Sequence, residues 1–266
     1  HPFMVIASFS VHDMPFRLMD VPRPPGSGIP AGSRYEQQDV TRDALLANFL
    51  VKIPLRDYGE VSEIGENDML TEGNTLADDA GERQINVWNY ASNSSLGIAI
   101  DGVLIYPPLN NTLHITTEQG EIANTGSHVG RGLNLHWHVD GHAATKHGLN
   151  LYNLPDYDGH QHPPLIGFGL DGIALYGIYE DSFPDMDGIE LQLNLFGGHE
   201  HDNYNYHYHS HLMDSREMGS SHDHTVQVLM RGAWAGNIES IPSFWSPRGK
   251  KVDVTGDSQY VGMNRR

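Results

Sequence analysis

The stretch IGFGLDGIALYGI, residues 166–178, sets the architecture of this chain. Two short apolar runs stand on either side of an Asp-Gly pair, a pattern typical of two β-strands joined by a tight turn. The stretch LGIAIDGVLIYPP, residues 96–108, repeats the pattern without gaps at an offset of 70 residues, so that Asp101 corresponds to Asp171. The sequence therefore contains two copies of one strand-turn-strand unit.

A second pair of matching segments follows these two. SHVGRGLNLHWH, residues 127–138, aligns with GHEHDNYNYHYH, residues 198–209, at an offset of 71 residues. The alignment matches three pairs of histidines, which are His128 with His199, His136 with His207, and His138 with His209. Two copies are too few for a solenoid, so we expect two β units that share one core.

The fold class that follows is mainly β, an internally duplicated, β-sandwich-like domain with a pseudo-twofold axis and a short N-terminal helical segment. We expect the duplicated domain at residues 85–232, with repeats at about 95–140 and 165–211. An N-terminal extension at 1–84 should pack on the core, and a C-terminal extension should occupy 233–266. The 29 glycines and alternating runs such as TVQVLM favour the same class.

The helical segment is expected in TRDALLANFLVKIP, residues 41–54. Thr41 is a suitable N-cap, Pro54 would end the helix, and apolar residues recur between them at helical spacing. These apolar residues are Leu45, Leu46, Phe49, Leu50 and Ile53.

Composition narrows the possible partners. The chain of 266 residues has 34 acidic and 16 basic side chains, a formal net charge of −18, and no cysteine. Such an acidic chain argues against nucleic acid as a partner, and no apolar run is long enough to predict a membrane span. Without thiolates, a transition metal must be held by histidine and by oxygen ligands. The 17 histidines therefore make a metal ion the expected partner.

The matched histidines have the spacing of metal ligands. Residues i and i+2 of a strand lie on one face, so each His-x-His pair can converge on one ion, and a hairpin would bring the third histidine of each copy beside it. Three neutral imidazoles with an open position are typical of zinc and of copper, whereas calcium and magnesium prefer oxygen. We therefore predict copper or zinc at His199, His207, His209, His128, His136 and His138.

Other polar residues are alternatives to these ligands. The second copy is richer in histidine, so we expect the tighter site there. The histidines of the first copy would then form a weaker second site or contribute to one site shared across the pseudo-twofold axis. Asp101 and Asp171 allow two interpretations, since an Asp-Gly carboxylate can orient a ligand imidazole or can form the turn itself. The histidines that can ligate or support the site in addition are His201, His211, His162 and His224.

The chain also resembles a known family. An Asp-Gly strand, LIGFGLDGIALYG, preceded by HPP, is followed by GHEH and then YHYH at Tyr206–His209. This combination, which spans about residues 95–212, resembles the YHYH-domain family, whose members are exported or surface proteins. The resemblance implies a secreted or periplasmic location, and it implies no particular reaction.

Two functions remain open at this point. In the first, the protein is a metalloenzyme whose three-histidine site activates water on zinc or dioxygen on copper, and acts on an extracellular or periplasmic small molecule or polymer. In the second, it binds or sequesters copper or zinc at the cell surface without turnover. A cleft with a vacant coordination position favours the first function, and a closed site with four ligands favours the second.

Overall fold

β-Strands dominate the computed structural model of the protein. It describes residues 2–11, 49–62, 95–110, 114–119, 122, 125–129, 135–140, 151–152, 157–178, 191–242 and 244. In these parts twelve strands form one curled eight-stranded sheet and two two-stranded sheets. The mainly β class predicted from the sequence is confirmed.

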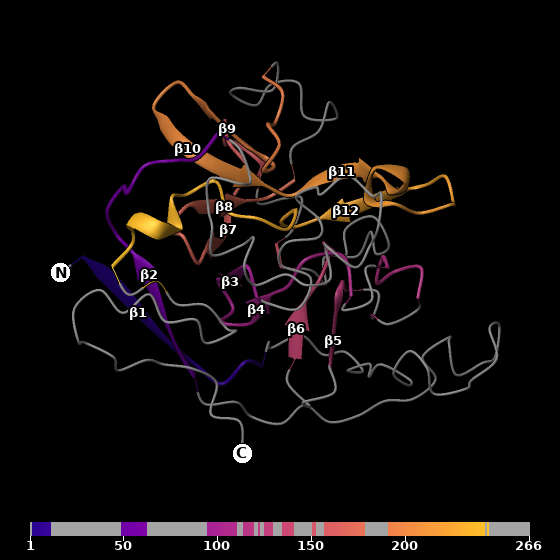
Figure 1. Ribbon diagram of the computed structural model, residues 1–266, viewed down its shortest axis with the longest axis horizontal. Coiled ribbons are helices and arrows are strands. Elements are labelled where there is room, and N and C mark those ends of the chain that lie inside the picture. The colour runs from indigo at the N-terminus through magenta and orange to yellow at the C-terminus, as the bar shows by residue number, and fades with distance from the viewer. Residues whose placement is uncertain are drawn as a thin grey trace.

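The eight-stranded sheet has the strand order β5-β6-β4-β3-β7-β8-β10-β9. Its strands are β3 (Gly97–Ala99), β4 (Leu104–Ile105), β5 (Ser127–Val129), β6 (Leu135–Trp137), β7 (Leu165–Gly169), β8 (Ala174–Tyr176), β9 (Gly198–His201) and β10 (Tyr204–His209). Figure 1 shows this sheet between the two smaller ones, which lie on opposite sides of the molecule. Those are β1 (Phe3–Ser8) with β2 (Phe49–Pro54), and β11 (His211–Asp214) with β12 (Thr225–Val228).

The pattern of strand pairing is the same when the large sheet is followed from either edge to its centre. At its centre β3 and β7 are antiparallel, with Ile98 opposite Phe168. On each side the next pair is a hairpin, β3–β4 or β7–β8, followed by a parallel neighbour, β6 or β10, and an antiparallel edge strand, β5 or β9. The registers correspond as well, because His128 lies opposite His136 and His199 lies opposite His207.

The Asp-Gly pairs form the turns of the two hairpins. Gly102 and Gly172 have φ of 83° and 93°, a backbone conformation that favours glycine. The carboxylate of Asp101 accepts a hydrogen bond from the amide of Val103 at 2.9 Å, and that of Asp171 accepts one from the amide of Ile173 at 3.3 Å. Each turn thus fixes the strand that lies beside a histidine-bearing strand, which is β4 beside β6 and β8 beside β10.

The helix expected at residues 41–54 is wrong where the structure describes it. Phe49–Pro54 is strand β2, antiparallel to β1, and residues 41–48 lie outside the described part. Val51 and Ile53 are buried whereas Leu50 is exposed, which is an alternation of period two. The helical spacing was misleading because the partner strand β1 lies more than forty residues away in the sequence.

One apolar core joins the sheets and the short 3-10 helices η4 (Ser215–Met218) and η5 (Ile238–Ser240). Val51 of β2 and Trp234, beyond β12, are both buried in it, and the indole of Trp234 donates to the carbonyl of Leu96 at 2.7 Å. In the described ranges no helix has the length and hydropathy required to cross a bilayer.

Substitution of Asp171 by alanine should destabilise the protein by about 2–4 kcal/mol. This buried carboxylate accepts hydrogen bonds from the hydroxyl of Tyr208 at 2.6 Å and from the amide of Gly236 at 3.0 Å. The alanine would leave both donors unsatisfied in the core. The free energy of unfolding in urea measures the effect. Asp101→Ala is the matched control, because Asp101 accepts from Trp137 but is only half-buried, and an equal loss in both variants would contradict the prediction.

Candidate metal centres

Four histidines gather at the β9–β10 edge of the sheet, and we call them the downstream histidine cluster. One nitrogen from each of them lies within 4.8 Å of the corresponding nitrogen of the other three, so the group could hold a metal ion. All four are at most 6% exposed. They are His162, His201, His207 and His209.

The local strand geometry explains this gathering. Side chains of β10 alternate between two faces, so His207 and His209 point to the cluster while Tyr208 packs in the core and bonds to Asp171. His201 is the last residue of β9, and His162 comes from the loop that precedes β7. The cluster therefore needs one hairpin and one distant loop.

His199 flanks the cluster as a fifth imidazole. It lies opposite His207 in the register of β9 and β10, and its ring centroid is 4.8 to 5.1 Å from those of His201, His207 and His209. The three histidines predicted from the second copy are therefore together, with His199 outside the group of four whose nitrogens are mutually close.

The Nδ1 atoms of the cluster determine which nitrogen can bind a metal. Nδ1 of His207 lies 2.7 Å from the carbonyl oxygen of Asn205, and that of His162 lies 3.0 Å from the carbonyl oxygen of Pro163. A carbonyl only accepts, so Nδ1 must carry the proton, and Nε2 of the neutral ring then has a free lone pair. Nδ1 of His209 is held in the same way by the carbonyl of Gly177 at 3.1 Å.

Two of these lone pairs face each other. Nε2 of His162 and Nε2 of His207 are 3.1 Å apart, and with both protons on Nδ1 neither can donate to the other. Two ligands bound to one tetrahedral ion at 2.0–2.1 Å would be about 3.3 Å apart. The contact therefore has nearly the geometry that a shared cation would impose.

A proton is a poor substitute for that cation. Burial lowers the pKa of His162 and of His207 to about 4, and the neighbouring imidazoles act in the same direction. Burial first, and then His207, lower the pKa of His199 to about 4 and that of His209 well below its ordinary value. At neutral pH these four rings are uncharged, which is the form that ligates a metal.

A second group lies on β5 and β6, and we call it the upstream histidine triad. It consists of His128, His136 and His138. Their Nε2 atoms form a triangle with sides of 2.8, 3.1 and 3.2 Å. Nδ1 of His138 lies 2.6 Å from the carbonyl oxygen of Pro107, and burial lowers the pKa of this histidine to about 4. The triad could hold one ion through three bonds and leaves further coordination positions open.

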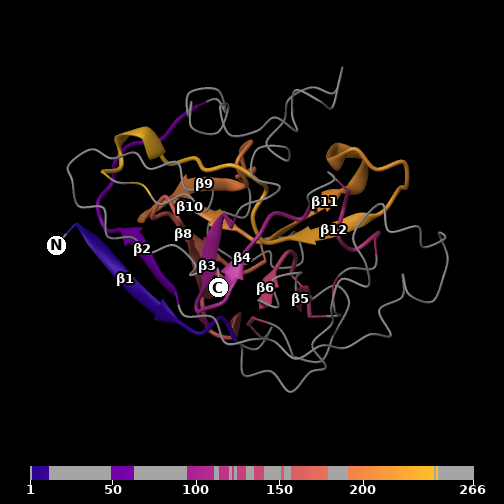
Figure 2. The same cartoon turned by 60° about the horizontal axis from the view of Figure 1, so that its bottom comes forward.

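The two groups are separate sites. The triad belongs to one edge of the eight-stranded sheet and the cluster to the other, and Figure 2 shows β5–β6 and β9–β10 well apart. A single site shared across the centre of the sheet is therefore not what the fold provides.

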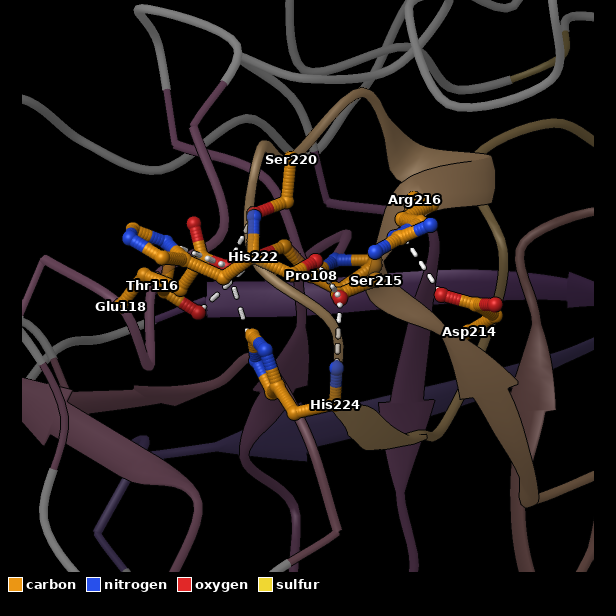
Figure 3. Close-up of polar contacts among 9 residues, drawn as sticks. All are labelled: Pro108, Thr116, Glu118, Asp214, Ser215, Arg216, Ser220, His222 and His224. Carbon is orange, nitrogen blue, oxygen red and sulfur yellow. Dashed lines mark hydrogen bonds and ion pairs between the residues drawn. The ribbon is translucent and has the colours of Figure 1, made fainter.

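The remaining predicted residues have other partners. Nδ1 of His211 bonds to the carbonyl of His209 at 2.8 Å, and its Nε2 accepts from Arg231 at 3.0 Å, so both nitrogens are engaged. His224 lies with His222 beside Glu118, each at 3.6 Å from the carboxylate (Figure 3).

Asp101 and Asp171 form their turns and also bind the aromatic residues that separate the histidines. Asp101 accepts from the indole of Trp137 at 3.1 Å, and Asp171 accepts from the hydroxyl of Tyr208. These carboxylates therefore position β6 and β10 from the face of each strand that lies away from the histidines. Their side-chain partners are Trp137 and Tyr208 and not an imidazole.

A cavity of about 470 Å³ adjoins the downstream cluster. Tyr176, Tyr204 and His207 line it, together with Asp57 and Glu60. The ring of Tyr204 stacks on that of His162 at 4.1 Å, and the ring of Tyr176 meets it edge-on at 4.3 Å. His207 is only 1% exposed, so very little of its surface is open to the cavity.

Among the four histidines of the cluster, His162 is the one that the sequence indicates least clearly. Its signal was the His-x-His spacing of DYDGHQHPP, but nothing in that loop shows that it folds back onto β10.

Comparisons of the chain with protein-family models, with curated proteins and with solved structures found no match.

Proposed function

We propose that the protein binds zinc or copper at two separate histidine sites, the downstream cluster and the upstream triad. The observation that carries the proposal is the 3.1 Å contact between Nε2 of His162 and Nε2 of His207, whose Nδ1 atoms both lie on carbonyl oxygens. Two buried lone pairs at this distance repel each other unless a cation lies between them. Zinc and copper are the metals that suit an all-imidazole site.

The downstream cluster favours binding without turnover. Four imidazoles complete a tetrahedral shell, none of them is more than 6% exposed, and of the four only His207 is among the residues that line the adjoining cavity. A substrate would have to displace a ligand to reach the ion. Of the two functions left open by the sequence, storage or sequestration of the metal therefore fits this site better.

The upstream triad is the place where a metalloenzyme activity would reside. It offers three imidazoles, and His136 is half-buried with the ring of Tyr106 at 4.3 Å. Bound zinc would supply an activated water there, and bound copper would supply redox chemistry. The substrate would be a small molecule or polymer outside the cytoplasm. This second candidate function rests on the open coordination positions of the triad.

We also propose that the chain arose by an internal duplication and that the protein is exported. An internal duplication is supported by corresponding registers, since Ile105 pairs with Trp137 in one half as Leu175 pairs with Tyr208 in the other. An exported location is supported by the resemblance of the YHYH-containing segment alone.

Zinc or copper(II) should raise the melting temperature of the metal-free protein. An ion that binds only the folded state at a free concentration a thousand times its Kd stabilises it by about 4 kcal/mol, which corresponds to roughly 8–16 °C for a chain of this size. Calorimetry at pH 7.5 measures the shift on protein purified without an affinity tag. Magnesium is the control, because it prefers oxygen ligands. Equal melting temperatures with zinc, copper and magnesium would overturn the proposal.

A further inference from the structure

The orientation of His201 depends on a side chain, unlike that of its neighbours. Nδ1 of His201 lies 3.1 Å from Oδ2 of Asp202, whereas His162, His207 and His209 are held by backbone carbonyls. A carboxylate bonded to the far nitrogen of a ligand imidazole fixes its tautomer and makes it a stronger donor to the metal. His201 is thus the ligand that a substitution can weaken without touching the ligand itself.

The other nitrogen of His201 points into the cluster. Nε2 of His201 is buried and has no hydrogen-bond partner, and His201 belongs to the group of four histidines that could hold a metal ion. A proton donated from Nδ1 to Asp202 leaves the lone pair on Nε2. In this pair the carboxylate of Asp202 accepts from Nδ1 of His201 and leaves Nε2 for the ion, as in a carboxylate–histidine–metal arrangement.

The hairpin turn holds Asp202 in place. Asp202 follows the last residue of β9 and has φ of 47°, in the left-handed region that aspartate, asparagine and glycine tolerate best. Its side chain is 60% exposed while that of His201 is 2% exposed. The carboxylate remains hydrated on one side and reaches the buried ring on the other, so its charge is not an unpaired buried charge.

The aligned segment of the first copy lacks both residues. At the aligned offset of 71, Gly130 stands for His201 and Arg131 stands for Asp202. The histidine and its carboxylate thus occur together in the second copy and are absent together from the first. This co-occurrence is expected if the carboxylate serves the histidine.

We infer that Asp202 is a positioning residue of the downstream metal site, which holds His201 with Nε2 directed at the ion. The inference rests on the proposed function, because it assigns Asp202 to a zinc or copper site. Loss of such a carboxylate typically weakens metal affinity by about 10–100-fold. The ion itself is bound by imidazoles, so Asp202 acts only through His201.

Three variants test the inference by competition of zinc with a chelator at pH 7.5. Asp202→Gly keeps the turn conformation and removes the acceptor, and it should weaken binding by about 10–100-fold. Asp202→Asn keeps an acceptor at the same φ and should recover part of this loss. Asp223→Asn, which removes one charge from an exposed pair with Arg216, should leave the affinity unchanged. Wild-type affinity in Asp202→Gly, or an equal loss in Asp223→Asn, would overturn the inference.

A measurement without metal separates the inference from the proposed function. Long-range ¹H–¹⁵N spectra of the metal-free protein should show His201 with its proton on Nδ1, and Asp202→Gly should shift its tautomer population toward Nε2–H. A proton on Nε2 in the wild-type protein would overturn the role of Asp202. If the tautomer is as expected and zinc still does not bind, the proposed function fails and the structural role of Asp202 stands.

Discussion

Replacing both His207 and His209 with alanine should lower the zinc affinity of the downstream site about ten-thousandfold. Structural zinc sites contribute about 10–16 kcal/mol of binding free energy, or roughly 3 kcal/mol for each of four ligands, and each 1.4 kcal/mol is a factor of ten. Both residues lie on one face of β10, and each has its Nδ1 on a backbone carbonyl. Metal content of the purified variant, together with chelator competition, measures the loss.

The matched control is the double substitution of His136 and His138, which align with His207 and His209 at an offset of 71 residues. It should remove the ion of the upstream triad and leave the tight ion in place, because the two sites lie at opposite edges of the sheet. Far-ultraviolet circular dichroism shows whether each variant is folded. If the control variant loses the tight ion while the His207 and His209 variant keeps it, the assignment of the two sites is reversed.

The metal-free protein should unfold on mild acidification. Burial lowers the pKa of four histidines to about 4 in the folded state, compared with about 6.5 when unfolded, and these are His138, His162, His199 and His207. Below pH 6.5 the unfolded chain therefore takes up protons that the folded protein does not. The contribution of these histidines to the free energy of unfolding is fully present above pH 6.5. It is lost as the pH falls towards 4, by up to about 1.4 kcal/mol per histidine and pH unit.

Even half of that value, over four groups and two pH units, is comparable with the roughly 5–15 kcal/mol that stabilises a typical domain. The urea midpoint of the metal-free protein should thus fall steeply between pH 6.5 and 4.5. The His207 and His209 double variant should show a flatter profile, since it has fewer buried imidazoles. A midpoint that is independent of pH over this range would contradict the prediction.

The sequence predicted the parts of the fold that depend on local chemistry. Asp-Gly flanked by apolar runs predicted the two hairpins, and the alternation in YHYH placed His207 and His209 on one face. These features arise from residues within a few positions of one another. A period of two and a glycine at positive φ are visible without any knowledge of tertiary contacts.

The remainder depends on contacts between distant segments. Strand β2 takes its conformation from β1, and local spacing alone favoured a helix there. His162 joins the cluster because its loop packs on β10, 45 residues further along the chain. The role proposed for Asp202 depends on the orientation of the ring of His201, which the sequence does not indicate.

The hairpin β9–β10 has a consequence for the order in which the chain assembles. Four imidazoles, those of His199, His201, His207 and His209, lie within eleven consecutive residues, whereas β3 and β7 at the sheet centre join segments nearly seventy residues apart. Closing a short loop takes on the order of 10–100 ns and carries little entropic penalty, while long-range pairing limits the folding rate. An ion captured by the hairpin would therefore act as a folding nucleus, around which the slow pairing of the two halves is completed and onto which the loop of His162 closes last.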